Sequence, residues 1–246
     1  MPKQDFVLVI GAGSTIAKAI IRHLLQHTDW KVVAISRDYT AHYMQQFDAN
    51  QNLHHFSCDY TQASISRRTK ALQAWHGDCR QVFICNGMLH QQSLQPEKSL
   101  NQLSNDSMLQ SLTVNLVVPS LWLAAIMPLL NHGRAATVTV FSARVGSIED
   151  NKLGGWYSYR SAKAALNMMI KSAAIEYART CKSVKLLAFH PGTTDTPMSK
   201  PFQKNLPPGQ LLEPNYVAER IIELALRQQA NGQASYLDFN GKAIPW

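Results

Sequence analysis

The chain has 246 residues, of which 46% are hydrophobic, and its formal net charge is +8. This length and composition argue against a disordered chain and allow one large α/β domain or two small ones. The basic residues are scattered, with one doublet at Arg67 and Arg68. We therefore expect no nucleic-acid partner. The alternative is a nucleic-acid-binding α/β protein, which DNA binding that weakens with salt would favour.

Strand-like and helical patterns alternate along the chain. In chain order, short apolar or β-branched runs predict strands at 6–10, 31–36, 52–59, 81–85, 136–142, 183–190 and 234–239. Helical patterns lie between them at 14–27, 61–75, 100–113, 116–131, 156–180 and 215–229. Repeated β-α units with right-handed crossovers build a doubly wound parallel sheet with both faces covered. We therefore expect an α/β fold of the Rossmann type with about seven strands, in a single domain over 1–246.

The connection 191–214 holds six prolines and is too long for an ordinary link between a strand and a helix. Loops of this length often close over a substrate, so we expect a substrate loop at about 193–214. The longest apolar run, 116–130, falls short of the roughly 20 residues that cross a bilayer. The N-terminal apolar stretch is too short for a signal peptide. These features predict a protein with no membrane segment.

The cysteines point to a reducing compartment. None of the four belongs to a Cys-x-x-Cys pair, and their spacing matches no metal site. They are Cys58, Cys79, Cys85 and Cys181. Free thiols are typical of the cytosol, so we expect a cytoplasmic protein with no bound metal.

The segment VLVIGAGSTIAKAI places a glycine-rich turn between the first strand and the first helix. Gly11 and Gly13 match the first half of the dinucleotide fingerprint G-x-G-x-x-G, but Ile16 stands at the third glycine position. Such a turn lets the backbone approach a pyrophosphate at a helix N-terminus. A turn glycine in an ordinary β-α unit is the alternative.

The segment WYSYRSAKAAL carries two tyrosines ahead of one lysine. Tyr159 and Lys163 are four residues apart and share one face of a helix, whereas Tyr157 is six residues from Lys163 and lies elsewhere. A phenol has a pKa of about 10, which an ammonium within ~4–6 Å lowers. Tyr159 could then transfer a proton near neutral pH. The alternative is an ordinary amphipathic helix face.

Several motifs in order resemble the short-chain dehydrogenase/reductase family over about 6–246. The matching positions are Ile10, Gly11, Thr15 and Ala17 for the glycine motif, Asp59, Cys85-Asn86-Gly87, Asn115, Tyr159-x-x-x-Lys163 and Pro191-Gly192. Only the first glycine of the family's opening motif is kept. The segment SARVGSI and the C-terminal YLDFNGKAIPW look most like the C-factor and carbonyl-reductase branch.

The catalytic serine of that family has no clear counterpart. If Gly146 sets the register, the serine position is Ala143, and Ser142 lies one residue early. An insertion around 149–155 also lengthens the interval to Tyr159. Ser142 is our first candidate and Ser147 the second, and no serine at this position is the third possibility.

The resemblance implies hydride transfer between a nicotinamide cofactor and a small carbonyl or alcohol. It makes Tyr159 the general acid or base, and it makes Lys163 the group that lowers the tyrosine pKa and holds the nicotinamide ribose. Ser142 would stabilise the carbonyl oxygen, and Asn115 would position Lys163 through water. The expected cofactor-binding residues are Gly11, Gly13, Ser14, Thr15, Ile16, Ser36, Arg37, Asp59, Tyr60, Asn86, Gly87, Lys163, Pro191, Gly192, Thr193 and Thr196.

The end of the second predicted strand bears on the choice of cofactor. An acidic residue there binds a ribose 2′-hydroxyl, and an arginine accommodates a 2′-phosphate. Ser36 occupies the acidic position, and Arg37, which could grip a phosphate, follows it. We expect NADP(H) rather than NAD(H), although Asp38 would favour NAD(H) if it reached the ribose.

A rival interpretation is a catalytically weak or inactive nucleotide-binding protein with a signalling or regulatory role on the same fold. The degraded glycine motif and the uncertain serine favour it, whereas Asn115, Tyr159 and Lys163 favour the enzyme. By resemblance we expect a homodimer or homotetramer. The sequence does not identify the substrate.

Overall fold

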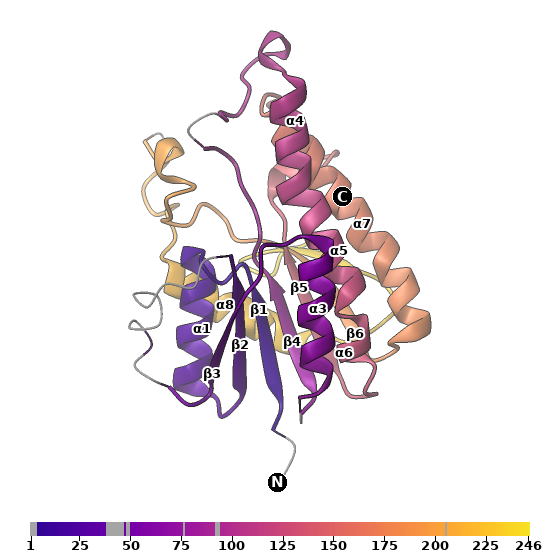
Figure 1. Cartoon of the computed structure of the whole chain (residues 1–246). Coiled ribbons are helices and arrows are strands. Elements are labelled where there is room, and N and C mark those ends of the chain that lie inside the picture. Colours follow the sequence, from indigo (N-terminus) through magenta and orange to yellow (C-terminus); the bar gives the residue numbers. More distant parts are fainter. Residues whose placement is uncertain (1–3, 38–46, 48–49, 76, 92–93, 205) are drawn as a thin grey trace.

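The computed structural model describes residues 4–37, 47, 50–75, 77–91, 94–204 and 206–246. Its strands form one seven-stranded parallel sheet in the order β3-β2-β1-β4-β5-β6-β7 (Figure 1). The strands are β1 Phe6–Ile10, β2 Lys31–Ser36, β3 Leu53–Ser57, β4 Cys79–Ile84, β5 Ala136–Phe141, β6 Val184–His190 and β7 Ser235–Asp238. The predicted α/β class and doubly wound sheet are therefore confirmed, and each predicted strand has its counterpart.

Helices cover both faces of this sheet (Figure 1). They are α1 Thr15–His27, α3 Gln62–Gln73, α4 Asn105–Leu112, α5 Val118–Ala125, α6 Met127–Leu130, α7 Tyr157–Thr180 and α8 Pro214–Arg227. Short 3₁₀ turns lie at Leu100–Gln102, Arg144–Gly146 and Lys200–Phe202.

Two separate cores result from the alternation of side chains along the strands. On β1, Phe6, Leu8 and Ile10 pack with the helices α3, α5, α6 and α7. Val7 and Val9 point to the opposite face and pack with α1 and α8. Successive side chains of a strand point to opposite faces. This is why a continuous apolar run such as FVLVI marks a strand that is buried on both sides.

The predicted helices 100–113 and 116–131 are less regular than their patterns suggest. Ser104 caps α4 by accepting a hydrogen bond from Ser107 N at 3.2 Å, so this helix begins at Asn105. A π-helical turn, Thr113–Val117, joins α4 to α5. Its backbone pairs residues five apart, a spacing that a hydrophobic pattern does not reveal.

By length and composition, the stretch Asn105–Ala125 is apolar enough to cross a membrane, with 28% of its most apolar window buried in the fold. The 15-residue run considered from the sequence began later and missed this possibility. Core helices of soluble proteins meet the same criteria of length and composition, so this stretch alone does not identify a membrane span. Among the residues that the structure describes, no group of three His, Cys, Asp or Glu side chains could hold a metal ion.

The carboxyl ends of the strands all lie at one edge of the sheet, toward the top of Figure 1. The long connections after β4 and β6 rise above this edge. The second of these includes the predicted substrate loop. An isolated bridge between Thr194 and Leu212 closes the base of that loop, and the turn Lys200–Phe202 lies within it.

Candidate active site

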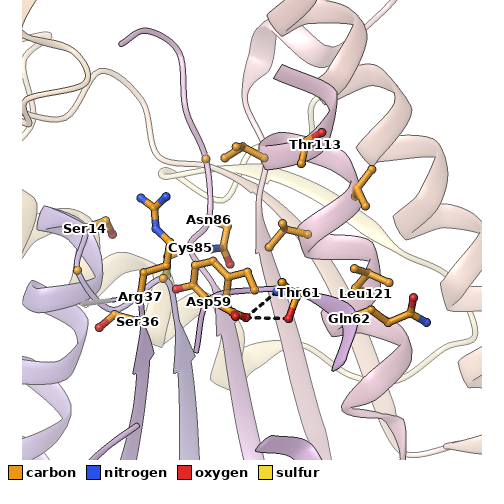
Figure 2. A pocket seen from close by; sticks show the side chains of 17 residues that line it. Ser14, Ser36, Arg37, Asp59, Thr61, Gln62, Cys85, Asn86, Thr113 and Leu121 are labelled. Atoms are coloured by element: carbon orange, nitrogen blue, oxygen red, sulfur yellow. Dashed lines mark hydrogen bonds between the residues drawn. The ribbon is translucent and has the colours of Figure 1, made fainter. Parts of the chain in front are cut away.

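A cleft runs along the carboxyl edge of the sheet, and its larger part is a cavity of about 750 Å³. The cavity lies where the strand order reverses, between the ends of β1 and β4. Figure 2 shows Ser14, Ser36 and Arg37 on one side of it and Thr113 and Leu121 on the other. Ligands of open α/β sheets bind at such a switch point.

The turn after β1 brings backbone N–H groups to this cavity. Gly11 has φ +77°, and a Cβ there would lie 3.0 Å from the backbone nitrogen of Asn86. A Cβ on Gly13 would meet nothing within 4 Å, so the backbone at that residue is open to the cleft. Ser14 caps α1 by accepting a hydrogen bond from Ala17 N at 3.2 Å. Because the first turn of α1 holds no acidic residue, its positive end suits a phosphate.

The adenosine side of the predicted cofactor site is built from the ends of β2 and β3. Ser36 is buried, and its hydroxyl shares a hydrogen bond of 2.7 Å with His55 Nε2. Arg37 is exposed at the rim of the large cavity. Asp38 lies outside the described residues. A side chain as short as serine leaves room beside a ribose, and the exposed guanidinium next to it suits an anion.

Asp59 and Tyr60 also line the large cavity. The Asp59 carboxylate accepts hydrogen bonds from Thr61 N at 2.9 Å and Thr61 Oγ1 at 2.8 Å, which Figure 2 marks, and these bonds lower the pKa of Asp59. Tyr60 has a left-handed backbone with φ 65°, and its hydroxyl donates to Ile35 O at 3.3 Å. Burial raises the pKa of Tyr60 to about 12, so its hydroxyl stays protonated.

The inner part of the cleft is a second cavity of about 270 Å³, and Tyr159 and Lys163 both line it. The two residues belong to α7, and Lys163 Nζ lies 5.8 Å from the centre of the Tyr159 ring. The predicted pairing on one helix face is therefore present. Lys163 is 2% exposed, and its ammonium donates a hydrogen bond to Phe141 O at 2.8 Å.

The protonation states differ from those expected from the sequence. We predicted that Lys163 lowers the pKa of Tyr159, but burial raises the pKa of Tyr159 well above its ordinary value, and the nearby Tyr236 adds to the rise. Burial also lowers the pKa of Lys163 to about 7. Both changes have one cause, because a low-dielectric site disfavours a charged group of either sign. Tyr159 therefore holds its proton at neutral pH, and the predicted lowering is wrong for this arrangement.

Asn115 is completely buried in the π-helical turn. Its amide donates to Met88 O at 2.8 Å and to Ser111 O at 3.1 Å, and its carbonyl oxygen accepts from Met88 N at 2.9 Å. A Cβ built on Gly87 would lie 3.5 Å from Asn115 Oδ1 and 3.6 Å from Lys163 Nζ. Asn115 therefore ties the strand-β4 connection to the helix beside the lysine.

Ser142 lines the inner cavity, but its proton is already engaged. Its hydroxyl donates to Asn167 Oδ1 at 2.6 Å, while Asn167 Nδ2 donates to Gly146 O at 3.1 Å. A hydroxyl has one proton, so Ser142 would have to release Asn167 before it could donate to a substrate oxygen. Ser147, the second candidate, is buried and accepts a hydrogen bond from Asp150 N at 3.1 Å.

These residues fit a dinucleotide. The two cavities share Gly13, Ser14, Cys85, Asn86 and Gly87, so they form one elongated cleft. Asn86 Oδ1 is buried there with no hydrogen-bond partner among the described residues. A buried acceptor without a partner is unfavourable, and a ligand donor would satisfy it. The positive end of α1 lies at the junction of the cavities, where a pyrophosphate would sit.

Comparison with known proteins agrees with this geometry. The family model described as short chain dehydrogenase matches residues 5–207. The chain belongs to this family. The family membership predicted from the motifs is thereby confirmed.

Two relatives match over about 150 residues. The chain is 32% identical over 151 residues to 1-hydroxy-2-glutathionyl-2-methyl-3-butene dehydrogenase of Rhodococcus sp. (strain AD45), a match that covers 60% of this chain and 62% of that protein. It is 31% identical over 150 residues to the C-signal protein of Myxococcus xanthus, covering 60% of this chain and 84% of that protein. The chain thus spans less than two thirds of the length of the Rhodococcus relative.

Solved structures show the same fold over nearly the whole chain. The NADPH-bound carbonyl reductase from chicken fatty liver superposes with a TM-score of 0.84 at 22% identity, covering 99% of this chain and 100% of that one. A short-chain dehydrogenase/reductase from Burkholderia multivorans with bound NADP gives a TM-score of 0.83 at 21% identity, with 100% of both chains covered.

Most residues that the family resemblance suggested line the cleft. Thr15, Ile16, Pro191 and Thr196 line the inner cavity. Gly192 and Thr193 line neither cavity. Gly192 instead makes a left-handed turn with φ +70°, and Thr193 O accepts a hydrogen bond from Leu212 N at 2.9 Å. Both residues shape the base of the substrate loop.

Asn167 and Tyr236 were missed by the sequence analysis. Asn167 follows Lys163 by four residues and extends the stripe of Tyr159 and Lys163 along α7, so the helical spacing could have revealed it. Tyr236 on β7 donates a hydrogen bond to Ala143 O at 2.6 Å. No local signal marks Tyr236, because this contact joins residues 93 apart in the chain.

Proposed function

We propose that the protein is an NADP(H)-dependent oxidoreductase that acts on a small carbonyl or alcohol compound. The observation that carries the proposal is the cleft in which Tyr159 and the buried Lys163 lie next to the turn after β1. The nicotinamide cofactor, when bound, supplies or accepts the hydride. Tyr159 transfers the proton, and Lys163, held by Phe141 O and flanked by Asn115, orients the nicotinamide ribose.

The raised pKa of Tyr159 keeps its phenol protonated near neutral pH, the form that carbonyl reduction requires. A protonated phenol can give its proton to the oxygen that develops negative charge as a carbonyl is reduced. In the oxidising direction the phenolate accepts the proton of the alcohol, and burial raises the pH at which that phenolate forms. Ser142 contributes to the oxygen site only by exchanging its bond to Asn167 for one to the substrate.

The test is turnover of NADPH with a panel of aldehydes, ketones and diketones. We expect oxidation of NADPH with at least one carbonyl compound, and the apolar side chains of the inner cavity, among them Ile16, Phe141 and Met198, favour apolar substrates. A protein that binds NADPH and turns over none of the panel would support the alternative, a nucleotide-binding protein with a signalling or regulatory role. Alanine at position 143 and the engaged proton of Ser142 are the observations that favour this alternative.

Cofactor preference depends on Arg37 in this proposal. A bidentate bond from a guanidinium to a phosphate contributes about 1.5–3 kcal/mol, so Arg37→Ala should weaken NADPH binding roughly 10- to 100-fold. It should leave NADH binding nearly unchanged. Titration of the two cofactors by fluorescence checks this, with Arg179→Ala, at an exposed position on α7, as the control. Tighter binding of NADH than NADPH by the unaltered protein would contradict the assignment.

The homodimer or homotetramer suggested by the family resemblance remains a prediction, as does the cytoplasmic location. Exposed apolar side chains on α4 and α7 support self-association. They are Leu109, Met168, Met169 and Ile175. The mass of the protein in solution tests the assembly.

A further inference from the structure

A glutamate from a distant loop holds the start of the helix that carries Tyr159 and Lys163. Glu97 lies in the connection between β4 and α4 and is 3% exposed. Its carboxylate accepts hydrogen bonds from both the hydroxyl and the backbone N–H of Ser158, the latter at 3.2 Å. Its backbone carbonyl accepts from Trp156 N at 2.5 Å. Ser158 immediately precedes Tyr159.

The start of α7 lacks a cap of its own. Trp156 occupies the N-cap position with a left-handed backbone, φ 51°, and makes no side-chain capping bond. Gly154 and Gly155 before it are also left-handed, with φ 65° and 67°. The first N–H groups of a helix have no partner within the helix, so they need one from elsewhere. Glu97 supplies acceptors to two of the positions at this start.

The charge of Glu97 has no cationic partner among the described residues. None of the ion pairs there includes it, although it is almost fully buried. A buried carboxylate is stable when N–H and O–H donors and the positive end of a helix dipole surround it. Ser158 and the start of α7 provide that environment. The start of α7 therefore stabilises the buried carboxylate of Glu97.

The same contacts hold an aromatic ring that lies between Tyr159 and the substrate loop. The Trp156 ring lies 6.5 Å from that of Tyr159 and 5.0 Å from that of Phe202 in the substrate loop. By fixing both Trp156 N and Ser158, Glu97 sets the direction in which the first turn of α7 presents Tyr159. A misplacement of about 1 Å in a reacting group can lower a rate by about 100-fold.

We propose that Glu97 is a positioning residue, which holds the first turn of α7 so that the Tyr159 hydroxyl meets the substrate oxygen. This inference rests on the proposed function. It implies that Glu97 affects kcat and leaves cofactor binding unchanged, because Glu97 lines neither cavity.

The test compares Glu97→Ala, Glu97→Gln and Ser158→Ala with the unaltered protein. Glu97→Ala should lower kcat about 10- to 100-fold with the same Kd for NADPH, since charge-assisted bonds of this kind are lost. Glu97→Gln keeps the shape and one acceptor oxygen, so it should recover part of kcat. Ser158→Ala removes only the hydroxyl donor and should lower kcat less. Glu219→Ala, at an exposed position on α8 across the sheet, should match the unaltered protein.

Hydrogen exchange followed by NMR gives a second readout that does not need turnover. In Glu97→Ala the amide of Ser158 should exchange about tenfold faster or more, because it loses its acceptor. The amide of Trp156 is an internal control, since its acceptor is the backbone carbonyl of residue 97, which the substitution retains.

The outcomes separate the two proposals. Unchanged kcat together with unchanged exchange at Ser158 would overturn the role of Glu97, and so would an NADPH Kd that worsens in step with kcat. Inactivity of the unaltered protein toward every carbonyl would instead overturn the proposed function, and the exchange result would still decide whether Glu97 holds the helix. Should Glu97→Ala fail to fold, Ser158→Ala decides, and an unchanged kcat there would count against the proposal.

Discussion

Replacing Tyr159 by phenylalanine should lower turnover by about 10²–10⁴-fold, the usual contribution of a positioned general acid. The substitution removes one hydroxyl from the inner cavity and keeps the ring that packs near Trp156. The Kd for NADPH should stay the same, because the phenol acts on the substrate oxygen. Steady-state kinetics with the best carbonyl substrate and a fluorescence titration of NADPH together check this result.

Tyr157→Phe is the matched control for that experiment. Tyr157 belongs to the same first turn of α7 but does not line the inner cavity. It should keep the turnover of the unaltered protein. Equal loss in the two variants would mean that the helix end, rather than the Tyr159 hydroxyl, is at fault. Full turnover in Tyr159→Phe would remove Tyr159 from the mechanism.

Replacing Lys163 by methionine should abolish most turnover and also change how stability depends on pH. Burial lowers the pKa of Lys163 to about 7 in the folded protein, against about 10.4 for an unfolded lysine. Between these values the unfolded state binds one more proton, so the free energy of unfolding rises with pH by about 1.4 kcal/mol per unit. Lys163→Met lacks this titration. When the pH rises from about 7.5 to about 9.5, the free energy of unfolding should therefore increase by about 2–3 kcal/mol more in the unaltered protein than in Lys163→Met.

Urea unfolding at the two pH values measures this difference. Lys171→Met is the control, because Lys171 is exposed on the same helix and lies 4.9 Å from the Trp246 ring. Its pH dependence should run parallel to that of the unaltered protein. If the pH dependence of Lys163→Met also ran parallel to that of the unaltered protein, the lowered pKa of the buried Lys163 would be contradicted.

The fold could be predicted from the sequence because its signals are local. Each strand is a short apolar run, and the two-sided burial of β1 is visible in FVLVI itself. The start of α1 follows from Ser14, whose side chain caps the helix. The π-helical turn at Thr113–Val117 could not be predicted in this way. This turn holds Asn115, whose bonds to Met88 join residues 27 apart in the chain and leave no local signal.

The part of the site that depends on the spacing of residues along the chain could be predicted. Tyr159 and Lys163 share a face of α7 because four residues make about one turn. Their proton affinities were not predictable, because burial depends on the whole fold and here outweighs the charge of the lysine. The engagement of Ser142 with Asn167 and the grip of Glu97 on Ser158 likewise arise from tertiary contacts.

The two hydrophobic cores on opposite faces of the sheet have a consequence for protein engineering. The side chains proposed to move the proton, Tyr159 and Lys163, belong to the α7 layer, whereas α8 packs against α1 in the other layer. Repacking around Val217 and Ile221 on α8 should therefore raise the melting temperature with no direct contact to Tyr159 or Lys163, provided that Phe141, which shares this core and lines the inner cavity, is kept. Thermostabilising substitutions should therefore be sought first in the layer that contains α8.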